Sequence, residues 1–119
     1  MKINVQKKAI IASGCLLLAI HAVFATITPI ACDGDLQGAI GILGERDTFS
    51  FTVNVGENFI VRMASGTSSL DPHLDLLDPS GSLLATDEQF SLARINWMPT
   101  VSGTYRIVAR DKTGNYTGS

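Results

Sequence analysis

Short stretches of alternating apolar and polar residues, separated by turns, constrain the fold of this 119-residue chain most strongly. Residues 49–55 and 59–63 both alternate with a period of two, which is the period of a half-buried β-strand. Turn-forming residues at 56–58 separate them, so an antiparallel hairpin is predicted. The side chains expected on the inward face are Phe49, Phe51, Val53, Val55, Phe59, Val61 and Met63.

Further strands follow at short intervals with turns between them. We expect them at residues 73–77, 83–85, 93–97 and 104–110. The turn at 78–81 has Asp first, Pro second and Gly fourth, which are the preferences of a type I turn. The inward side chains of these strands are Leu74, Leu76, Tyr105, Ile107 and Ala109. Strands of this length and spacing predict an all-β sandwich or barrel.

The first 25 residues have the pattern of a secretory signal peptide. A basic start (Lys2, Lys7 and Lys8) precedes an apolar run, and small residues then lead to a cleavage point after Ala25. We expect a signal helix that is removed on export, which places the mature protein outside the cytoplasm. The alternative is an uncleaved membrane anchor, although polar and proline residues interrupt the stretch of about twenty apolar residues that a span requires.

The chain therefore divides into a signal peptide at 1–25, a linker at 26–37 and a β-sandwich domain at 38–119. Beyond residue 25 there are six basic and eleven acidic residues, a net charge of −5. An acidic domain repels phosphate backbones and anionic lipid surfaces, so nucleic acid is excluded as a partner. Membrane contact is expected only through an uncleaved signal.

Three blocks of the sequence resemble a known family. Residues 44–53 are similar to the opening G-x-x-D-x-[FY]-x-F-x-V of the bacterial pre-peptidase C-terminal domain, and residues 71–85 are similar to its central hairpin. Residues 99–108 are similar to its P-x-x-G-T-Y-x-[IV]-x-V strand. The blocks occur in the family's order and the resemblance covers about residues 36–118. The family typically ends with a G-x-Y-x-L strand, whereas this chain stops at Gly118-Ser119, so the last strand is expected to be truncated.

The resemblance implies a jelly-roll-like antiparallel β-sandwich that is noncatalytic. Such domains are usually appended to secreted peptidases, where they assist export, attach to an extracellular substrate or are removed on maturation. An extracellular protein or polysaccharide is then the expected partner, with the oligomeric state left open. The alternative is a structural or cell-surface module, or a fragment of a longer multidomain exported protein.

Catalytic chemistry is not expected from the residues present. His73 is the only histidine beyond the leader, and a zinc site needs three or four ligands. A serine triad needs a nucleophile on a strained turn, but no G-x-S-x-G motif occurs. We therefore expect no enzyme, with His73 as an outward strand residue. Trp97 and Tyr105 are expected to be core aromatics rather than a flat binding surface.

Calcium is the one cofactor that the sequence and the resemblance suggest. Glu45 and Asp47 lie in the family's acidic motif, and Asp33 or Asp35 can fold back toward them from the linker. Calcium takes six to eight oxygen ligands, often from turns rich in aspartate. The alternative is that these carboxylates are solvated charges that keep turns and strand edges soluble.

Overall fold

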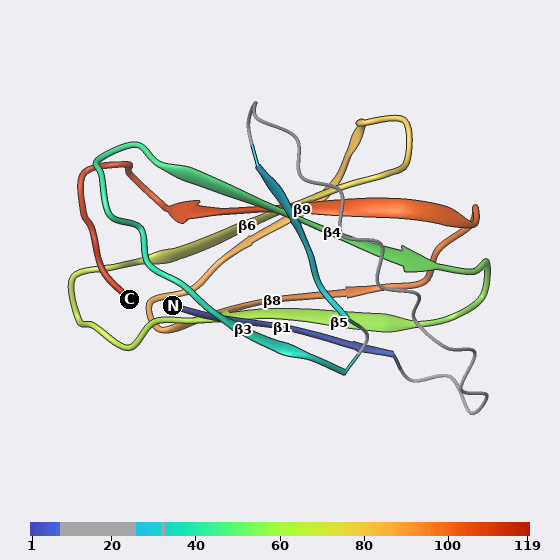
Figure 1. The fold of residues 1–119 in the computed structure, drawn as a ribbon, viewed down its shortest axis with the longest axis horizontal. Helices are drawn as coiled ribbons and strands as arrows, with labels where there is room; N and C mark the ends of the chain where they lie inside the picture. The colour runs from blue at the N-terminus through green and yellow to red at the C-terminus, as the bar shows by residue number, and fades with distance from the viewer. Residues whose placement is uncertain (8–25, 32) are drawn as a thin grey trace.

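The computed structural model describes residues 1–7, 26–31 and 33–119, and every regular element among them is a β-strand. The strands form two sheets packed face to face (Figure 1). Sheet A contains, in spatial order, β3 (Asp35–Gln37), β1 (Lys2–Lys7), β5 (Phe59–Ala64) and β8 (Leu92–Trp97). Sheet B contains β2 (Ile27–Pro29), β4 (Arg46–Val53), β9 (Gly103–Asp111), β6 (Pro72–Leu77) and β7 (Leu83–Glu88). The predicted all-β sandwich is confirmed, and its jelly-roll connectivity stays a prediction.

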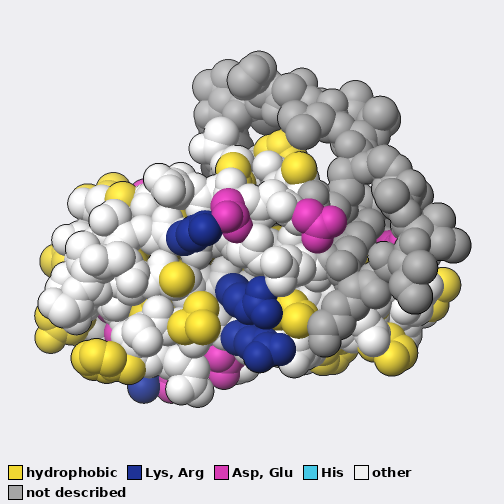
Figure 2. Space-filling view, turned by 90° about the horizontal axis from the view of Figure 1, so that it is seen from below, with side chains coloured by type: hydrophobic (Ala, Val, Ile, Leu, Met, Phe, Trp, Pro, Cys, Tyr) yellow, Lys and Arg dark blue, Asp and Glu magenta, His cyan; other side chains and the backbone are white. Residues whose placement is uncertain are grey.

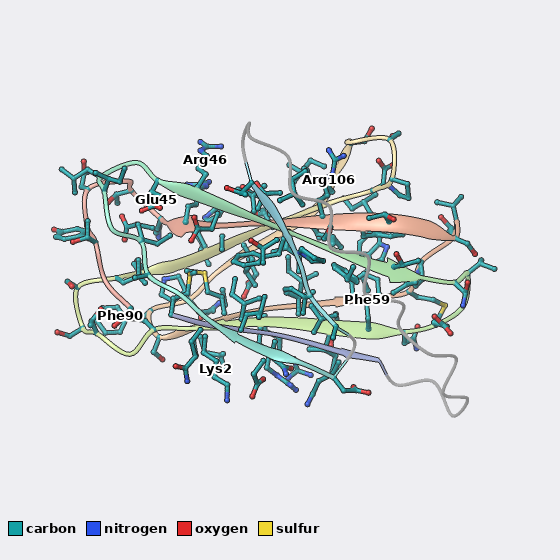
Figure 3. The ribbon with its side chains drawn as sticks, in the orientation of Figure 1. Lys2, Glu45, Arg46, Phe59, Phe90 and Arg106 are labelled. Atoms are coloured by element: carbon teal, nitrogen blue, oxygen red, sulfur yellow. The ribbon has the colours of Figure 1, made fainter. Side chains whose placement is uncertain are left out.

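The core lies between the sheets and consists of the alternate apolar side chains of their strands. Three aromatic rings join the two layers, since Phe59 of sheet A contacts Phe51 and Tyr105 of sheet B. The ring centroid of Phe59 lies 4.9 Å from that of Phe51 and 5.8 Å from that of Tyr105, and both ring pairs have edge-to-face geometry. Figure 3 shows Phe59 pointing from β5 into the space between the layers.

The inward faces were predicted correctly with one exception. Phe49, Phe51 and Val53 are buried, but Val55 is 60% exposed because β4 ends at Val53. Gly56 follows with a φ of +81°, a value that favours glycine and turns the chain. The inward residues expected from β5, β6 and β9 are all buried.

The predicted hairpin of β4 and β5 is wrong. β4 pairs with β9 and β2 in sheet B, whereas β5 pairs with β1 and β8 in sheet A. The turn between them carries the chain across the sandwich, so their apolar faces meet through the core instead of lying side by side. The predicted hairpin of β6 and β7 is confirmed, with His73 opposite Glu88 and Asp75 opposite Thr86.

The N-terminal residues differ from expectation. Residues 2–7, predicted to begin a signal helix, form strand β1 in the middle of sheet A, with Ile3 and Val5 fully buried. The segment 26–37, predicted to be a linker, contributes β2 and β3. The apolar run and the cleavage point after Ala25 lie outside the described residues. Within the described ranges, no helix is long and apolar enough to cross a membrane.

After β9 the described chain forms no further strand, and truncation of the last strand stays a prediction. Its last residues nevertheless stay attached to the sandwich, because Gly118 forms an isolated antiparallel bridge with Ile40. The two termini therefore lie near each other at one end of sheet A (Figure 1).

Candidate functional site

The outer face of sheet B carries a row of polar side chains across three strands. In register, Glu88 of β7 lies opposite His73 of β6, which lies opposite Arg110 of β9. Because successive side chains of a strand alternate between faces, the burial of Leu74 and Leu76 in the core puts His73 and Asp75 on the outer side. We call His73, Asp75, Thr86, Glu88 and Arg110 the histidine cluster.

His73 is enclosed by this cluster and is only 8% exposed. Its Nδ1 lies 3.1 Å from Glu88 Oε2, while its Nε2 lies 2.9 Å from Asp75 Oδ1. The same Nε2 is 2.9 Å from the Thr86 hydroxyl and 2.8 Å from Nη2 of Arg110. His73 therefore lies on the predicted outer face but is covered by its neighbours, rather than free in solvent.

The arrangement of Thr86, His73 and Glu88 superficially matches a hydroxyl, a base and an orienting carboxylate. A base must, however, offer a free lone pair to the hydroxyl. Here the Arg110 guanidinium, which can only donate, is already within hydrogen-bond distance of that nitrogen. The Thr86 hydroxyl in turn has two acceptors within reach for its single proton, the Asp75 carboxylate at 2.9 Å and the Leu74 carbonyl at 3.1 Å. These contacts describe a cross-strand network that fixes a polar surface, not an activated nucleophile.

The charges of the histidine cluster stabilise one another. Burial opposes ionisation of Asp75, but its contacts with His73 Nε2 and the Thr86 hydroxyl and the positive charge of Arg110 outweigh it and hold the pKa of Asp75 below its ordinary value. The Lys112 ammonium lies 3.0 Å from Glu88 Oε1 and is the main cause that lowers the pKa of Glu88. The outer face of sheet B thus presents ionised groups of both signs in fixed positions.

The outer face of sheet A is a second polar surface, and Figure 2 shows basic and acidic side chains interspersed on it. Lys2 of β1 pairs with Asp35 of β3 at 2.8 Å, and Asn4 donates to the same carboxylate at 2.6 Å. These contacts surround a shallow hollow whose lining includes Lys2, Asn4, Gln6, Asp33, Asp35 and Arg62. In Figure 3, Lys2 points away from the sandwich.

Glu45 and Asp47, the first two calcium candidates, lie at the start of β4. The Glu45 carboxylate already accepts hydrogen bonds from the backbone N–H groups of Gly41 and Ile42. Burial, with a smaller contribution from the charge of Glu45, raises the pKa of Asp47. Glu45 thus organises its own loop, while Asp47 is a partly buried carboxylate whose ionisation burial opposes.

The other two candidates, Asp33 and Asp35, lie around β3, where Lys2 and Asn4 hold Asp35 and lower its pKa. In the parts of the chain that the structure describes, no three His, Cys, Asp or Glu side chains come together as metal ligands. The four carboxylates are therefore not gathered into one group. Calcium binding by Glu45 and Asp47 stays a prediction.

The histidine cluster was missed from the sequence, although a signal was present. The hairpin of β6 and β7 was predicted, and its polar residues at alternate positions, 73 and 75 against 86 and 88, necessarily share one face. The contribution of Arg110 from β9 depends on a pairing across more than thirty residues, which the sequence does not reveal. Of the two aromatics, Tyr105 is buried as predicted, and Trp97 is partly buried against the core.

Comparison with known proteins gives one match. A family model for the bacterial pre-peptidase C-terminal domain matches residues 45–111, more than half of the chain. The matched segment begins one residue before β4 and ends at the last residue of β9, so it contains six consecutive strands of the sandwich. No curated protein and no solved structure gives a significant match.

Proposed function

Since the chain belongs to the bacterial pre-peptidase C-terminal domain family, we propose that it is an exported, noncatalytic accessory domain that binds an extracellular protein or polysaccharide. Domains of this family are noncatalytic and are associated with exported peptidases. The observation that carries the proposal is the family match itself, because it covers the strands that build most of the sandwich.

The geometry of sheet B supports a binding role. On its outer face β4 and β9 lie side by side, with Ser50 opposite Arg106 and Arg46 opposite Arg110. Figure 3 shows Arg46 and Arg106 projecting from this side of the molecule, away from sheet A. A surface that carries hydroxyl and guanidinium groups suits an extended polymer, since both kinds of group form hydrogen bonds with carbonyl and hydroxyl oxygens.

Export is tested by expressing the full chain with a C-terminal tag in a bacterium and analysing the extracytoplasmic fraction by mass spectrometry. The expected product begins at Thr26, as cleavage after Ala25 requires. A tagged protein that remains in the cytoplasm, or that is exported with Met1 intact, contradicts the signal-peptide part of the proposal.

Binding is tested by sedimentation of the purified protein with insoluble collagen, cellulose and chitin. The variant Arg106→Ala should weaken the interaction because it removes a charged donor from the outer face of sheet B. The matched control Arg94→Ala removes the same group from β8 in sheet A and should leave binding unchanged. Equal loss in both variants, or no binding to any polymer, argues against sheet B as the binding face.

A further inference from the structure

The ring of His73 has more partners within reach than it can bond at once. Its Nε2 lies 2.8 Å from Arg110 Nη2, 2.9 Å from Asp75 Oδ1 and 2.9 Å from the Thr86 hydroxyl. An imidazole nitrogen either accepts through its lone pair or donates through its N–H. Because Arg110 can only donate and the ionised Asp75 can only accept, these two residues compete for the same nitrogen of His73.

Glu88 selects the form of the neutral ring. Its Oε2 lies 3.1 Å from Nδ1 of His73, where a lone pair on the nitrogen would face a lone pair on the carboxylate. The neutral ring therefore carries its proton on Nδ1 and donates it to Glu88, which leaves Nε2 as an acceptor. Arg110 supplies the matching donor, so neutral His73 holds the Arg110 guanidinium in the histidine cluster.

A second proton on the ring reverses this choice of partner. It is taken up at Nε2, so the imidazolium donates from Nδ1 to Glu88 and from Nε2 to Asp75. The Nη2 donor of Arg110 then faces an N–H group that also carries positive charge, at a separation of 2.8 Å. Like charges this close repel each other, most strongly where neighbouring groups exclude water. The guanidinium must therefore move away from the ring.

The other members of the cluster keep their charges between pH 8 and pH 5. The pKa values of Asp75 and Glu88 lie below their ordinary values, so both carboxylates stay ionised throughout this range. The guanidinium of Arg110 stays protonated throughout it too. Histidine is the side chain that ordinarily changes its charge between these pH values. Proton uptake by His73 is therefore the event that changes the charge of the cluster.

We propose that proton uptake by His73 moves its Nε2 from Arg110 to Asp75 and releases the Arg110 guanidinium to the outer face of sheet B. In the neutral state all three nitrogens of this guanidinium have partners within the protein. Besides the contact of Nη2 with His73, Nε lies 3.4 Å from Asp75 Oδ2 and Nη1 donates to the Lys112 carbonyl at 3.0 Å. The Arg110 side chain is accordingly only 22% exposed. Loss of the His73 contact makes Nη2 available to a ligand.

Release of Arg110 strengthens the binding face of sheet B, and this consequence rests on the proposed function. Arg110 lies opposite Arg46 of β4, while Arg106 lies four residues earlier on β9, on the same face and exposed. The freed guanidinium adds a donor to these two for the oxygens of a bound polymer. The Lys112 ammonium, the other cation beside the cluster, stays paired with Glu88 at 3.0 Å. Binding should therefore be tighter at pH 5 than at pH 8.

The switch is tested by NMR on the full chain, which follows the ¹⁵N signals of the histidine rings and the arginine side chains from pH 8 to pH 5. The variant His73→Gln identifies the His73 signals by their loss. At pH 8 the ring should carry its proton on Nδ1, with Nε2 unprotonated. As His73 takes up its second proton, hydrogen exchange of the Arg110 guanidinium should rise at least fivefold relative to that of Arg106. The exposed Arg106 corrects for the direct effect of pH on exchange.

His73→Gln is also the matched control, because its amide oxygen can accept from Arg110 while the side chain cannot take up a proton. In this variant the ratio of Arg110 to Arg106 exchange should change by less than about twofold between the two pH values. A neutral ring protonated on Nε2, or a ratio that does not respond to protonation of His73, overturns the proposal. An equal rise in His73→Gln also overturns it, because another group then releases Arg110.

The effect on binding is measured by sedimentation with insoluble collagen, cellulose and chitin at pH 8 and pH 5. For a polymer that binds, the affinity should be at least threefold higher at pH 5, and His73→Gln should remove most of this difference. Equal affinities of the unmodified protein at the two pH values contradict regulation of the face by His73. Absence of binding to every polymer instead counts against the proposed function, and the NMR measurement still decides whether His73 controls Arg110.

Discussion

The substitution Ile3→Ala tests the most consequential feature of the fold, the use of the N-terminal residues as an internal strand. Ile3 is 0% exposed and lies on β1 between two partner strands, so the space left by its side chain cannot easily collapse. Deletion of a buried isoleucine side chain to alanine costs about 2–5 kcal/mol. We expect a loss of about 3 kcal/mol in the free energy of unfolding, a large part of the total for a domain of this size.

The assay is urea unfolding of the uncleaved full chain, followed by the fluorescence of Trp97. This residue is the only tryptophan and lies opposite Phe59, the residue of β5 that pairs with the end of β1. With a slope of about 1.5 kcal/mol per molar urea, the midpoint should fall by about 2 M. The matched control Gln6→Ala changes an exposed side chain of the same strand and should cost less than about 0.5 kcal/mol.

The result that refutes the reasoning is equality of the two variants. If residues 1–7 lie outside the core in solution, Ile3→Ala and Gln6→Ala will both unfold at the midpoint of the unmodified chain. Sheet A would then lack its internal strand in solution.

Three further predictions follow from the core and the carboxylates. Tyr105→Phe should cost about 1 kcal/mol in urea unfolding, because it removes the hydrogen bond from the Tyr105 hydroxyl to the Val101 carbonyl while keeping the buried ring; an unchanged midpoint would contradict this. Burial opposes ionisation of Asp111, but hydrogen bonds from the backbone of Asp71 and from Thr113 and Asn115 lower its pKa. Its stabilisation should therefore be complete above the unfolded pKa of about 4 and fall as the pH drops through the folded value, so Asp111→Asn should melt earlier at pH 7 and approach the unmodified chain near pH 2. If Glu45 and Asp47 bind calcium, millimolar calcium should raise the melting temperature and Asp47→Asn should abolish the rise, whereas no rise in the unmodified chain rejects the site.

The local alternation of the sequence determined which residues form strands and which side chains point inward. Phe51, Phe59 and Tyr105 were assigned to inward faces from a period of two alone, because that period depends only on neighbouring residues. The β6–β7 hairpin was equally predictable, since the Asp78-Pro79-Ser80-Gly81 turn between its strands has strong local preferences. The three blocks of family resemblance were likewise visible without any structure.

Tertiary structure decided which strands pair with one another. The turn after Val53 was predicted to close a hairpin, but the chain crosses to the other sheet. The apolar side chains of β4 and β5 are buried in this arrangement too, so the alternating pattern is compatible with both pairings and does not choose between them. The same long-range pairing brings Arg110 to His73 and so creates the histidine cluster. It also recruits residues 2–7, whose alternation resembles any short strand, into the open position beside β5. Strand partners separated by tens of residues are selected by the geometry of the whole core, and a local sequence pattern does not determine which strands pair.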